Sequence, residues 1–391
     1  MQWILPPAHP ERIALLARKL GISQVLANLL LRRGYHVPDA ALAFLNPNLA
    51  DLADPLLMGG MRGAVNRLEQ ALRNQESVLI FGDYDVDGVT STTLLAHFLR
   101  QFGLNPRFIV PRRMGEGYGL SVESLERAIA MQKPDLVIAV DCGTASVQEV
   151  RWLKDRGISA IIIDHHSPPD ELPADCELVN PHVLDPEDVP WKDLCSVGLV
   201  FKFCHAVVKV LRQKGDPLAE RMDLRQYLDL VALGTVADLV RLTGENRILV
   251  RSGLKALRAC RRPGICALMD VAGLSLGDPL DAGDIGFKLG PRINASGRLD
   301  DATLPIELLL SEDWQSCREK AQILDQHNGE RQEIERHITL EAEKLVQSRH
   351  EEDLGLVLYA PHWHTGVVGI VASRLTRQFH RPALVLGAEE G

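Results

Sequence analysis

Short apolar runs alternate with segments of helical spacing through much of the first half of the chain. The runs lie at residues 78–81, 108–110, 136–140 and 158–163. Each is apolar at consecutive positions, which is typical of strands buried on both faces of a parallel sheet. Between them, segments such as 121–131 and 145–156 repeat apolar residues every three or four positions, as amphipathic helices do. The alternation predicts an α/β fold with a parallel sheet.

Other patterns flank this region. Residues 13–20 and 25–33 have helical apolar spacing and precede Asn-Pro and Asp-Pro breaks, which predicts a helical N-terminal segment. A second helical region extends from about residue 221 to 271, and the glycine-rich stretch at 286–297 is expected to form a loop. Residues 314–347 are charged with helical spacing, and unless Asn-Gly at 328–329 interrupts them they form a connector ~50 Å long.

The last segment returns to the α/β pattern, with an expected strand at 354–358, a helix at 364–377 and a strand at 382–386. We therefore expect four parts: a helical segment at 1–60, a parallel-sheet domain at 61–290, a motif loop and helical connector at 291–350, and the first part of a second α/β domain at 351–391. Because the pattern stops midway, we expect a fragment whose second domain is truncated.

Composition limits the classes of function. A formal net charge of −9 over 391 residues argues against a basic coat and restricts nucleic-acid binding to a local groove. No apolar run approaches the ~20 residues of a bilayer span, and the N-terminus lacks an export pattern, so we expect a cytoplasmic protein with no membrane segment. The seven cysteines include no Cys-x-x-Cys pair, which predicts reduced, mostly buried thiols.

Acidic residues and histidines follow the apolar runs. The sequence Asp-Tyr-Asp-Val-Asp-Gly at 83–88 follows the first run, Asp141 follows the third, and Asp164-His165-His166 follows the fourth. The carboxyl ends of parallel strands share one edge of a sheet, so these side chains should converge. Carboxylates with imidazole suit a pair of Mn²⁺ or Mg²⁺ ions, which predicts a two-metal phosphoesterase.

Taken singly, these residues have structural alternatives. Asp141 could equally cap the helix expected after it, and Asp238, which ends another apolar segment, would be unremarkable at a helix terminus. The run at 83–88 also matches the opening of an EF-hand calcium loop. That loop needs a Glu where this chain has Leu94, and a helix where the pattern predicts a strand. We instead expect the run to lead from a strand into a helix that starts near Thr90.

Together these motifs resemble those of the DHH phosphoesterase superfamily and, within it, the RecJ family of single-strand-specific exonucleases. The segments that carry the resemblance lie at residues 81–91, 116–120, 234–240, 290–298 and 363–375. The resemblance implies a parallel-sheet DHH domain and a long helical connector, followed by a truncated second domain of the DHHA1 type. The closing glycine-rich motif of that domain and the OB fold that usually follows would lie beyond residue 391.

The resemblance also implies the roles of the site residues. The catalytic candidates are Asp83, Asp85, Asp87, Asp141, His165, His166 and Asp238, and all but His166 are expected metal ligands. Asp85 with Asp83 would hold one ion, although direct ligation by Asp83 is the least supported of the set. Asp141 would bridge the two ions.

The second ion would be held by Asp87, His165 and Asp238, and His166 would face the scissile phosphate. Two divalent ions are therefore expected. Mn²⁺ is preferred because an imidazole joins the carboxylates, and Mg²⁺ is the second choice.

Nine residues are expected to bind substrate: Arg112, Arg113, Tyr118, Arg292, Asn294, Arg298, His364, Ser373 and Arg374. The first three would offer guanidinium contacts and one stacking ring, or would form a solvated loop. The next three lie in the glycine-rich stretch, which would cradle phosphate or form a structural turn. The last three would line the far wall of a cleft between the two α/β domains, unless Arg374 is an ordinary surface residue.

The implied function is a metal-dependent exonuclease that degrades single-stranded DNA from 5′ to 3′ in DNA repair and recombination. A monomer is expected, with single-strand-binding protein or a helicase as partners. One alternative is a DHH phosphodiesterase acting on short oligonucleotides or cyclic dinucleotides, which the N-terminal segment and long connector disfavour. The other is a non-catalytic replisome scaffold with a DHH fold, which the complete ligand set disfavours.

Overall fold

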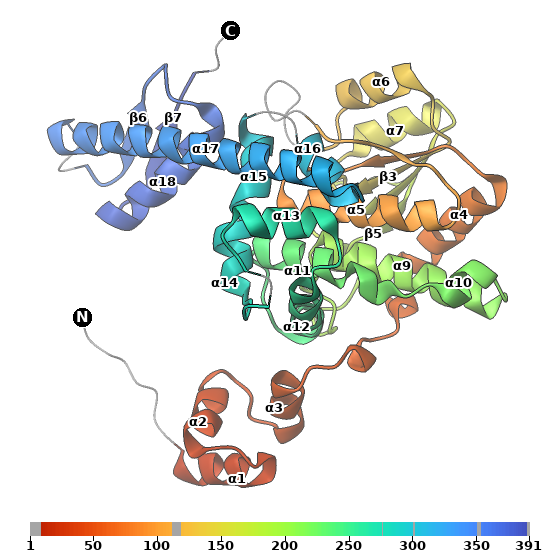
Figure 1. The fold of residues 1–391 in the computed structure, drawn as a ribbon, viewed down its shortest axis with the longest axis horizontal. Coiled ribbons are helices and arrows are strands. Elements are labelled where there is room, and N and C mark those ends of the chain that lie inside the picture. Colours follow the sequence, from red (N-terminus) through yellow and green to blue (C-terminus); the bar gives the residue numbers. More distant parts are fainter. Residues whose placement is uncertain (1–8, 112–118, 276, 300–301, 350–352, 389–391) are drawn as a thin grey trace.

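A five-stranded parallel sheet forms the centre of the first half of the chain (Figure 1). The computed structural model describes residues 9–111, 119–275, 277–299, 302–349 and 353–388. The strand order is β2-β1-β3-β4-β5, and every neighbouring pair is parallel. The strands are β1 (Val78–Phe81), β2 (Arg107–Ile109), β3 (Leu136–Val140), β4 (Ser159–Ile163) and β5 (Glu177–Val179). The predicted parallel α/β fold is confirmed, and only β5, with two apolar residues, was not anticipated.

Successive residues of the central strands face opposite layers of helices. Ile80 of β1 and Ile138 of β3 pack in one buried cluster with α5 (Val86–Gln101) and α9 (Ser196–Gln213). Leu79 and Val137, one residue earlier in each strand, pack in a second cluster with α6 (Val122–Met131) and α7 (Val147–Asp155). Because helices cover both faces, the strands need apolar residues at consecutive positions.

A helical body packs against α5 and α9 beside the sheet. Its central helix is α11 (Leu228–Ala237), which is buried from Leu228 to Val236 and packs against α5, α9 and α12 (Gly244–Ala259). The other helices here are α8 (Pro181–Leu184), α10 (Pro217–Arg221), η3 (Leu224–Tyr227), α13 (Pro263–Val271), α14 (Ala282–Asp284), η4 (Ile285–Leu289), α15 (Gly290–Leu299) and α16 (Thr303–Leu310). Through α11, which packs against α5, this body approaches the carboxyl ends of the strands.

Smaller units lie at the two ends of the chain (Figure 1). The N-terminal helices α1 (Pro10–Leu20), α2 (Gln24–Arg32) and α3 (Pro38–Leu45) share a small core, and η1 (Leu49–Asp51), η2 (Pro55–Leu57) and α4 (Met61–Asn74) lead to the sheet. At the other end, α17 (Trp314–Arg349) joins the helical body to α18 (Thr365–Phe379), β6 (Leu356–Tyr359) and β7 (Ala383–Leu386).

Among the described residues, no single helix is long and apolar enough to cross a membrane. Only α1 and α2 taken together, with a bend of 113° between them, pass the same test of length and composition.

The expectation of a loop in the glycine-rich stretch is wrong, because η4 and α15 make it helical. Ile285, Leu289 and Ile293 recur every four residues and are buried, so the stretch has an apolar helical face despite its glycines.

One other helix boundary differs from expectation, and the possible interruption at Asn-Gly 328–329 does not occur. Helix α5 starts at Val86, earlier than predicted, because Asp85 caps it by accepting a hydrogen bond from the backbone N–H of Gly88. Helix α17 continues through Asn328, whose buried side chain accepts a hydrogen bond from Arg331.

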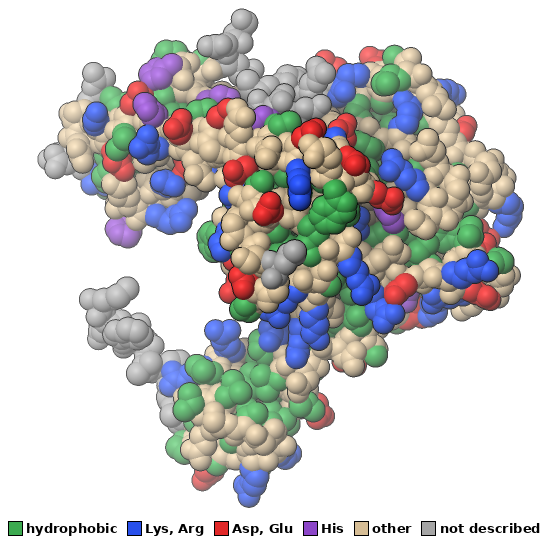
Figure 2. All heavy atoms as spheres, viewed as in Figure 1, with side chains coloured by type: hydrophobic (Ala, Val, Ile, Leu, Met, Phe, Trp, Pro, Cys, Tyr) green, Lys and Arg blue, Asp and Glu red, His purple; other side chains and the backbone are tan. Residues whose placement is uncertain are grey.

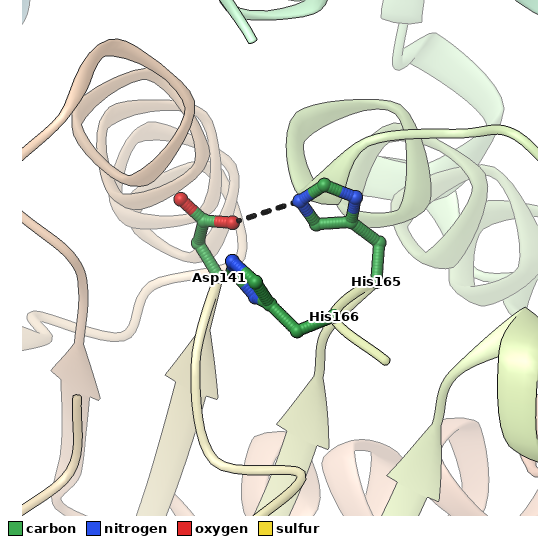
Figure 3. A group of neighbouring side chains, drawn as sticks. All are labelled: Asp141, His165 and His166. Carbon is green, nitrogen blue, oxygen red and sulfur yellow. Dashed lines mark ion pairs between the residues drawn. The ribbon is translucent and has the colours of Figure 1, made fainter. Parts of the chain in front are cut away.

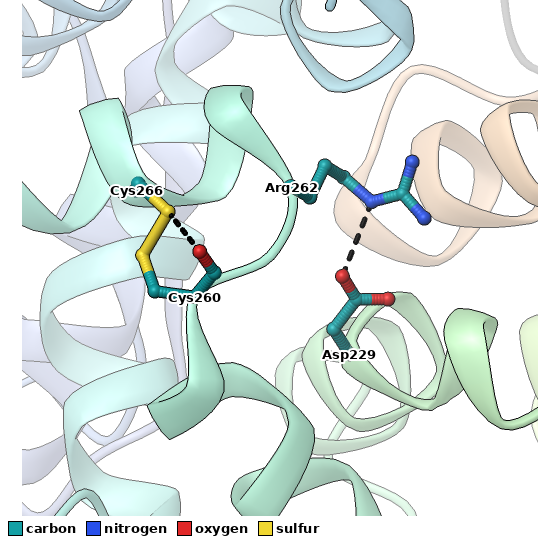
Figure 4. Close-up of a disulfide and its surroundings, with 4 residues drawn as sticks. All are labelled: Asp229, Cys260, Arg262 and Cys266. Atoms are coloured by element: carbon teal, nitrogen blue, oxygen red, sulfur yellow. Dashed lines mark hydrogen bonds and ion pairs between the residues drawn. A yellow bond between two sulfur atoms is a disulfide. The ribbon is translucent and has the colours of Figure 1, made fainter.

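A disulfide joins Cys260 to Cys266, so the expectation of reduced thiols is wrong for this pair (Figure 4). Cys260 ends α12 in a left-handed conformation and Cys266 lies in α13, so the bond closes the turn between the two helices. From the same turn, Arg262 reaches Asp229 of α11, with 3.1 Å between Nε and Oδ2. The other five cysteines are free, and four of them are buried.

Candidate metal centre

The acidic residues that follow the strands meet at the carboxyl edge of the sheet. The backbone N–H of Asp141, just after β3, donates to the carbonyl of Ile163, and that of Asp164, just after β4, donates to Val179. Each bond extends the sheet by one residue and fixes where the side chain leaves the backbone. Asp83 follows β1 after a single glycine, so the three motifs enter the site from neighbouring strands.

Three carboxylates surround the imidazole of His165. Its Nε2 atom lies 3.4 Å from Asp141 Oδ1, 3.6 Å from Asp238 Oδ2 and 3.8 Å from Asp87 Oδ2. The Asp141 oxygen and the imidazole nitrogen point toward each other in Figure 3. Within the described part of the chain, Nε2 and the facing oxygens of Asp141 and Asp238 are buried without a hydrogen-bond partner. Such spacing is long for hydrogen bonds but suits ligands that share an ion at ~2.0–2.3 Å each.

Asp141 also belongs to other groups of candidate ligands. Ligand atoms of Asp83, Asp85 and Asp141 all lie within 4.8 Å of one another, and so do those of Asp141, His165 and His166. Asp141 therefore belongs to both groups, the position that a bridging ligand requires. The six expected ligands are found in one group of Asp83, Asp85 and Asp141 and another of Asp87, His165 and Asp238, and Asp141 Oδ1 lies 3.4 Å from His165 Nε2 of the second group.

The backbone is shaped closely around these carboxylates. Asp141 has a φ of 65°, a left-handed conformation that residues other than glycine seldom adopt outside constrained sites. It does not cap α7, whose N-cap residue is Ser146. At Gly88, a Cβ atom would lie 2.5 Å from the backbone oxygen of Asp83, so only glycine allows α5 to begin this close to the strand end.

The side chains by themselves leave the site with unbalanced charge. Burial raises the pKa of Asp87 and of Asp141 well above the ordinary value, and neighbouring carboxylates raise both further. Burial and the charge of Asp85 raise the pKa of Asp238 to about 7. Burial lowers the pKa of His165 to about 4, so the ring is neutral, the form that binds metals. Divalent cations would balance these charges, so the residues present fit a two-metal site.

The start of α9 holds Asp87 in place. The backbone N–H groups of Ser196 and Val197 donate to its two carboxylate oxygens, at 2.6 and 2.8 Å. These amides belong to the first turn of a helix, where N–H groups lack helical partners and negative charge is favoured. Sequence reasoning missed both residues, because an apolar helix more than a hundred positions further along carries no local sign of contact with Asp87.

Asp164 supports the histidine pair. Its Oδ1 atom accepts hydrogen bonds from the backbone N–H groups of His165 and His166 and lies 2.7 Å from His166 Nδ1. Burial alone would raise the pKa of Asp164, but its bonds with His166 and Thr144 hold it well below the ordinary value. The same contact with Asp164 raises the pKa of His166 to about 9. Asp164 therefore orients the imidazole of His166 and holds the backbone of His165.

Asn180 links the loops that follow β3 and β4. Its Nδ2 atom donates to Thr144 Oγ1 and to the carbonyl of His166, both at 2.9 Å. The side chains of Asn180 and Thr144 are both buried. Neither was predicted, and the one available signal was the Asn-Pro step after the short strand β5.

The predicted substrate-binding residues are placed less uniformly. Arg112, Arg113 and Tyr118 lie outside the described residues. Arg292, on α15 instead of in a loop, pairs with Asp325 of α17 at 2.9 Å and donates to backbone carbonyls of Lys288 and Val271. Its contacts pin one helix to another, and phosphate binding by Arg292 stays a prediction.

The other two candidates on α15 connect the acidic run at residues 83–88 to the C-terminal unit of β6, α18 and β7. Asn294 Oδ1 accepts a hydrogen bond at 3.1 Å from the backbone N–H of Val86, which stands between Asp85 and Asp87. One turn later, Arg298 Nη1 donates to the carbonyl of Gly366 at the start of α18.

The last three candidates lie on or next to α18. His364 is its N-cap, and its Nδ1 accepts a hydrogen bond from the backbone N–H of Gly366. Ser373 is exposed, and Arg374, also exposed, pairs with the buried Glu335 of α17. No described metal-ligand group includes these residues, and their part in substrate binding remains a prediction.

Comparison with known proteins gives concordant matches. Residues 77–235 match the model of the DHH family, N-terminal domain. The single-stranded-DNA-specific exonuclease RecJ of Bacillus subtilis is 39% identical over 390 residues, which is all of this chain and 48% of that protein. The chain spans about half to three-fifths of the length of the curated relatives it matches first.

Solved structures agree. A structure of exonuclease RecJ bound to manganese has a TM-score of 0.75 and 32% identity, covering 86% of this chain and 82% of that one. RecJ from Thermus thermophilus in complex with Mn²⁺ has a TM-score of 0.81 and 30% identity, covering 98% of this chain and 53% of that one.

Proposed function

Because this chain belongs to the RecJ family of DHH proteins, we propose that it is a two-metal nuclease that degrades single-stranded DNA from the 5′ end. The observation that carries the proposal is the arrangement around His165, whose Nε2 faces three carboxylate oxygens at 3.4–3.8 Å. The identity of the substrate is inferred from the relatives, which are named single-stranded-DNA-specific exonucleases. The identity of the ions is inferred from solved members, which contain Mn²⁺. The 5′-to-3′ direction and a role in DNA repair and recombination come from the family resemblance.

The proposed ligand sets follow the two groups of side chains. Asp83 and Asp85 would hold one ion, and Asp141 would contribute to both. The other ion would be held by the three remaining ligands, Asp87, His165 and Asp238. Mn²⁺ is the preferred ion and Mg²⁺ the alternative.

When bound, two divalent ions supply activation of a water molecule and neutralisation of the charge that develops on the phosphate. The side chains provide the fixed frame for this chemistry. Asp87 is held by two helix amides, and Asp141 by a sheet hydrogen bond at its backbone N–H. His166, oriented through Nδ1 by Asp164, would face the scissile phosphate as a proton donor or a positive charge.

The same proposal covers the remaining parts of the chain. We place domain boundaries near residues 60, 290 and 350, with the DHH domain between the first two. The single strand would lie between this domain and the C-terminal unit, near His364, Ser373 and Arg374. A monomer, and partners such as single-strand-binding protein or a helicase, remain predictions.

The direct test is degradation of single strands of increasing length, labelled at one end, with Mn²⁺ present. We expect nucleotides to be released from the 5′ end of long strands, and no degradation when Asp141→Asn replaces the bridging ligand. Asn keeps the left-handed backbone accessible, so this variant should fold. The matched control is Asp135→Asn at the opposite end of β3.

Two outcomes would decide against the proposal. Activity confined to dinucleotides or cyclic dinucleotides would replace the exonuclease with a small-substrate phosphodiesterase. An inactive wild type that also binds no Mn²⁺ would favour a non-catalytic scaffold.

A further inference from the structure

A cavity of about 690 Å³ lies between the N-terminal segment, at residues 46–49, and the helical body. Residues 46–49 form one wall, and η3 with the first residues of α11 form another. The third wall is α12 and the turn after it, including Arg251, Lys255 and Arg261. None of the residues assigned to the metal centre lines it.

Positive charge predominates in this cavity. Four cationic side chains line it, Arg225, Arg251, Lys255 and Arg261, against two carboxylates. Both carboxylates are already neutralised: Asp223 pairs with Arg225 at 2.8 Å, and Asp229 pairs with Arg262 at 3.1 Å.

The three remaining cations are available to a ligand. Lys255 and Arg261 are exposed and have neither an ion pair nor a hydrogen bond with any described residue. Arg251 donates from Nη1 to the carbonyl of Leu45 and keeps other N–H donors. On a chain with a net charge of −9, this is a local concentration of unbalanced positive charge.

The cations form a row along one face of α12. Arg251, Lys255 and Arg258 are spaced by four and three residues, so they share a helical face over ~10 Å. Figure 2 shows Lys and Arg side chains gathered in this area, above the N-terminal helices. A row that continues beyond the cavity fits an extended polyanion better than a single small anion.

The chemistry of the lining indicates what would be recognised. Guanidinium and ammonium groups bind phosphate oxygens well, and guanidinium can do so through two parallel hydrogen bonds. The lining has no aromatic side chain on which a base could stack. Recognition would therefore be of the phosphate backbone, independent of sequence and of whether the DNA is single- or double-stranded.

We propose that this cavity and the adjoining face of α12 form an accessory site for the phosphate backbone of DNA, separate from the metal centre. It rests on the proposed function only in taking nucleic acid as the substrate. Asp229 lines the cavity at the start of α11, and Asp238 enters the metal centre at its end, ~14 Å further along the helix axis. The site holds DNA outside the position where hydrolysis takes place.

The test is equilibrium binding in EDTA, where no hydrolysis occurs, as a function of salt concentration. The double variant Lys255→Gln with Arg261→Gln is compared with Lys133→Gln with Arg151→Gln, which removes the same charge from exposed positions near α6 and on α7. The ligands are a fluorescent single strand and a duplex whose ends are closed by hairpins.

The logarithm of the binding constant falls linearly with the logarithm of salt, with a slope of about −0.9 per phosphate contact on duplex and about −0.7 on a single strand. We expect the cavity variant to reduce the magnitude of the slope by about 1.8 on duplex and about 1.4 on the single strand. The control variant should keep the wild-type slope. Lys255→Gln alone should give about half the change, which keeps the test valid if the double variant unfolds.

Equal slopes for the cavity and control variants would overturn the proposal. So would a cavity variant that loses binding of poly-glutamate but keeps binding of DNA, because the site would then be one for an acidic protein segment. Asp141→Asn should keep the wild-type slope on duplex. Loss of hydrolysis in every protein with slopes as expected would therefore contradict the proposed nuclease and leave this site in place.

Discussion

Two regions of this molecule bury charged side chains, and they differ in whether those charges are satisfied. Lys202 on α9 and Glu245 on α12 are almost completely buried and pair at 2.9 Å. Lys202 also donates to the carbonyl of Ala53 at 2.7 Å, and Glu245 accepts from the backbone N–H of Ala53 at 2.8 Å. Burial lowers the pKa of Lys202, and the charge of Glu245 opposes that shift. The two charges compensate each other, although Glu245 Oε2 accepts no hydrogen bond from the described residues, and the pair ties Ala53 of the N-terminal segment to two helices.

The metal centre has the opposite character. Its carboxylates face each other and a neutral imidazole, and oxygens of Asp141 and Asp238 are buried without hydrogen bonds to described residues. The contrast indicates how a structural ion pair differs from a binding site. Buried charge that finds its partner inside the fold is compensated there and destabilises the fold only when one partner is removed, whereas buried charge that lacks a partner marks a candidate ligand site.

The largest effect is expected at the satisfied pair. Lys202→Met leaves Glu245 buried without its counter-charge, so the free energy of unfolding should fall by ~3–5 kcal/mol. Denaturant unfolding in EDTA and with Mn²⁺ should give the same loss, because the pair takes no part in metal binding. Adding Glu245→Leu should restore most of the stability, and failure to do so would place the loss in packing instead of charge.

The unsatisfied cluster should respond to metal. At a Mn²⁺ concentration about one hundred times its dissociation constant, the wild type should gain ~2.7 kcal/mol of stability. Asp141→Asn should lose this gain, while its stability in EDTA should equal or exceed that of the wild type because one repelling charge is gone. Thermal unfolding with and without Mn²⁺ measures both. A variant that remains fully stabilised by Mn²⁺ would remove Asp141 from the ligand set.

A smaller effect, on Mn²⁺ affinity, should come from the hydrogen bond between Asn294 of α15 and the backbone of Val86. Asn294→Ala removes the hydrogen bond to the backbone N–H of Val86 and should weaken Mn²⁺ binding about fivefold, the equivalent of ~1 kcal/mol. Arg292→Ala, two residues earlier, serves as the control, because Arg292 pairs with Asp325 of α17 and its described contacts include no metal ligand. Calorimetric titration would give both affinities. Equal losses in the two variants would mean that α15 acts through its overall stability.

The smallest effect should be a pH dependence near the satisfied pair. Burial lowers the pKa of His205, one turn after Lys202 on α9, and the charges of Lys202 and Lys209 lower it further. A histidine whose pKa is lower in the folded state contributes stability above its unfolded pKa of about 6.5, and that stability is lost as the pH falls below it. His205→Gln should reduce the loss of stability in acid, with Mn²⁺ or without it. Unfolding measured between about pH 7 and pH 5 would test this, and an unchanged acid loss would exclude His205 as its source.

The candidate metal centre could be anticipated from sequence because most of its candidate ligands follow strands. An apolar run followed by Asp is visible locally, and parallel strands bring their carboxyl ends to one edge wherever the chain between them goes. Asp238 needed the family resemblance, because the end of a helix has no such geometric rule. Ser196, Thr144 and Asn180 were missed because they meet the site through helix and loop ends, and the one local signal was the Asn-Pro step at Asn180.

The helical regions likewise divide into features that local spacing predicts and features that depend on tertiary contacts. Periodic apolar spacing was enough to predict α17 and α18. It did not reveal that Ile285, Leu289 and Ile293 outweigh the glycines around them, or that Cys260 and Cys266 meet across a turn. The boundary of α5 depended on capping by Asp85, a hydrogen bond that becomes apparent only when the turn is formed.

By itself, the sequence determined the parallel sheet, the edge at which the carboxylates gather and the kind of ion they suit, because these depend on local periodicity and ligand chemistry. Only the tertiary structure decided which buried charges are satisfied. It also decided that Asp141 is shared between two ligand groups, and that the cations of α12 and the turn after it meet residues 46–49 around one cavity. Those facts depend on distances between segments far apart in the chain, which folding sets and local pattern does not encode.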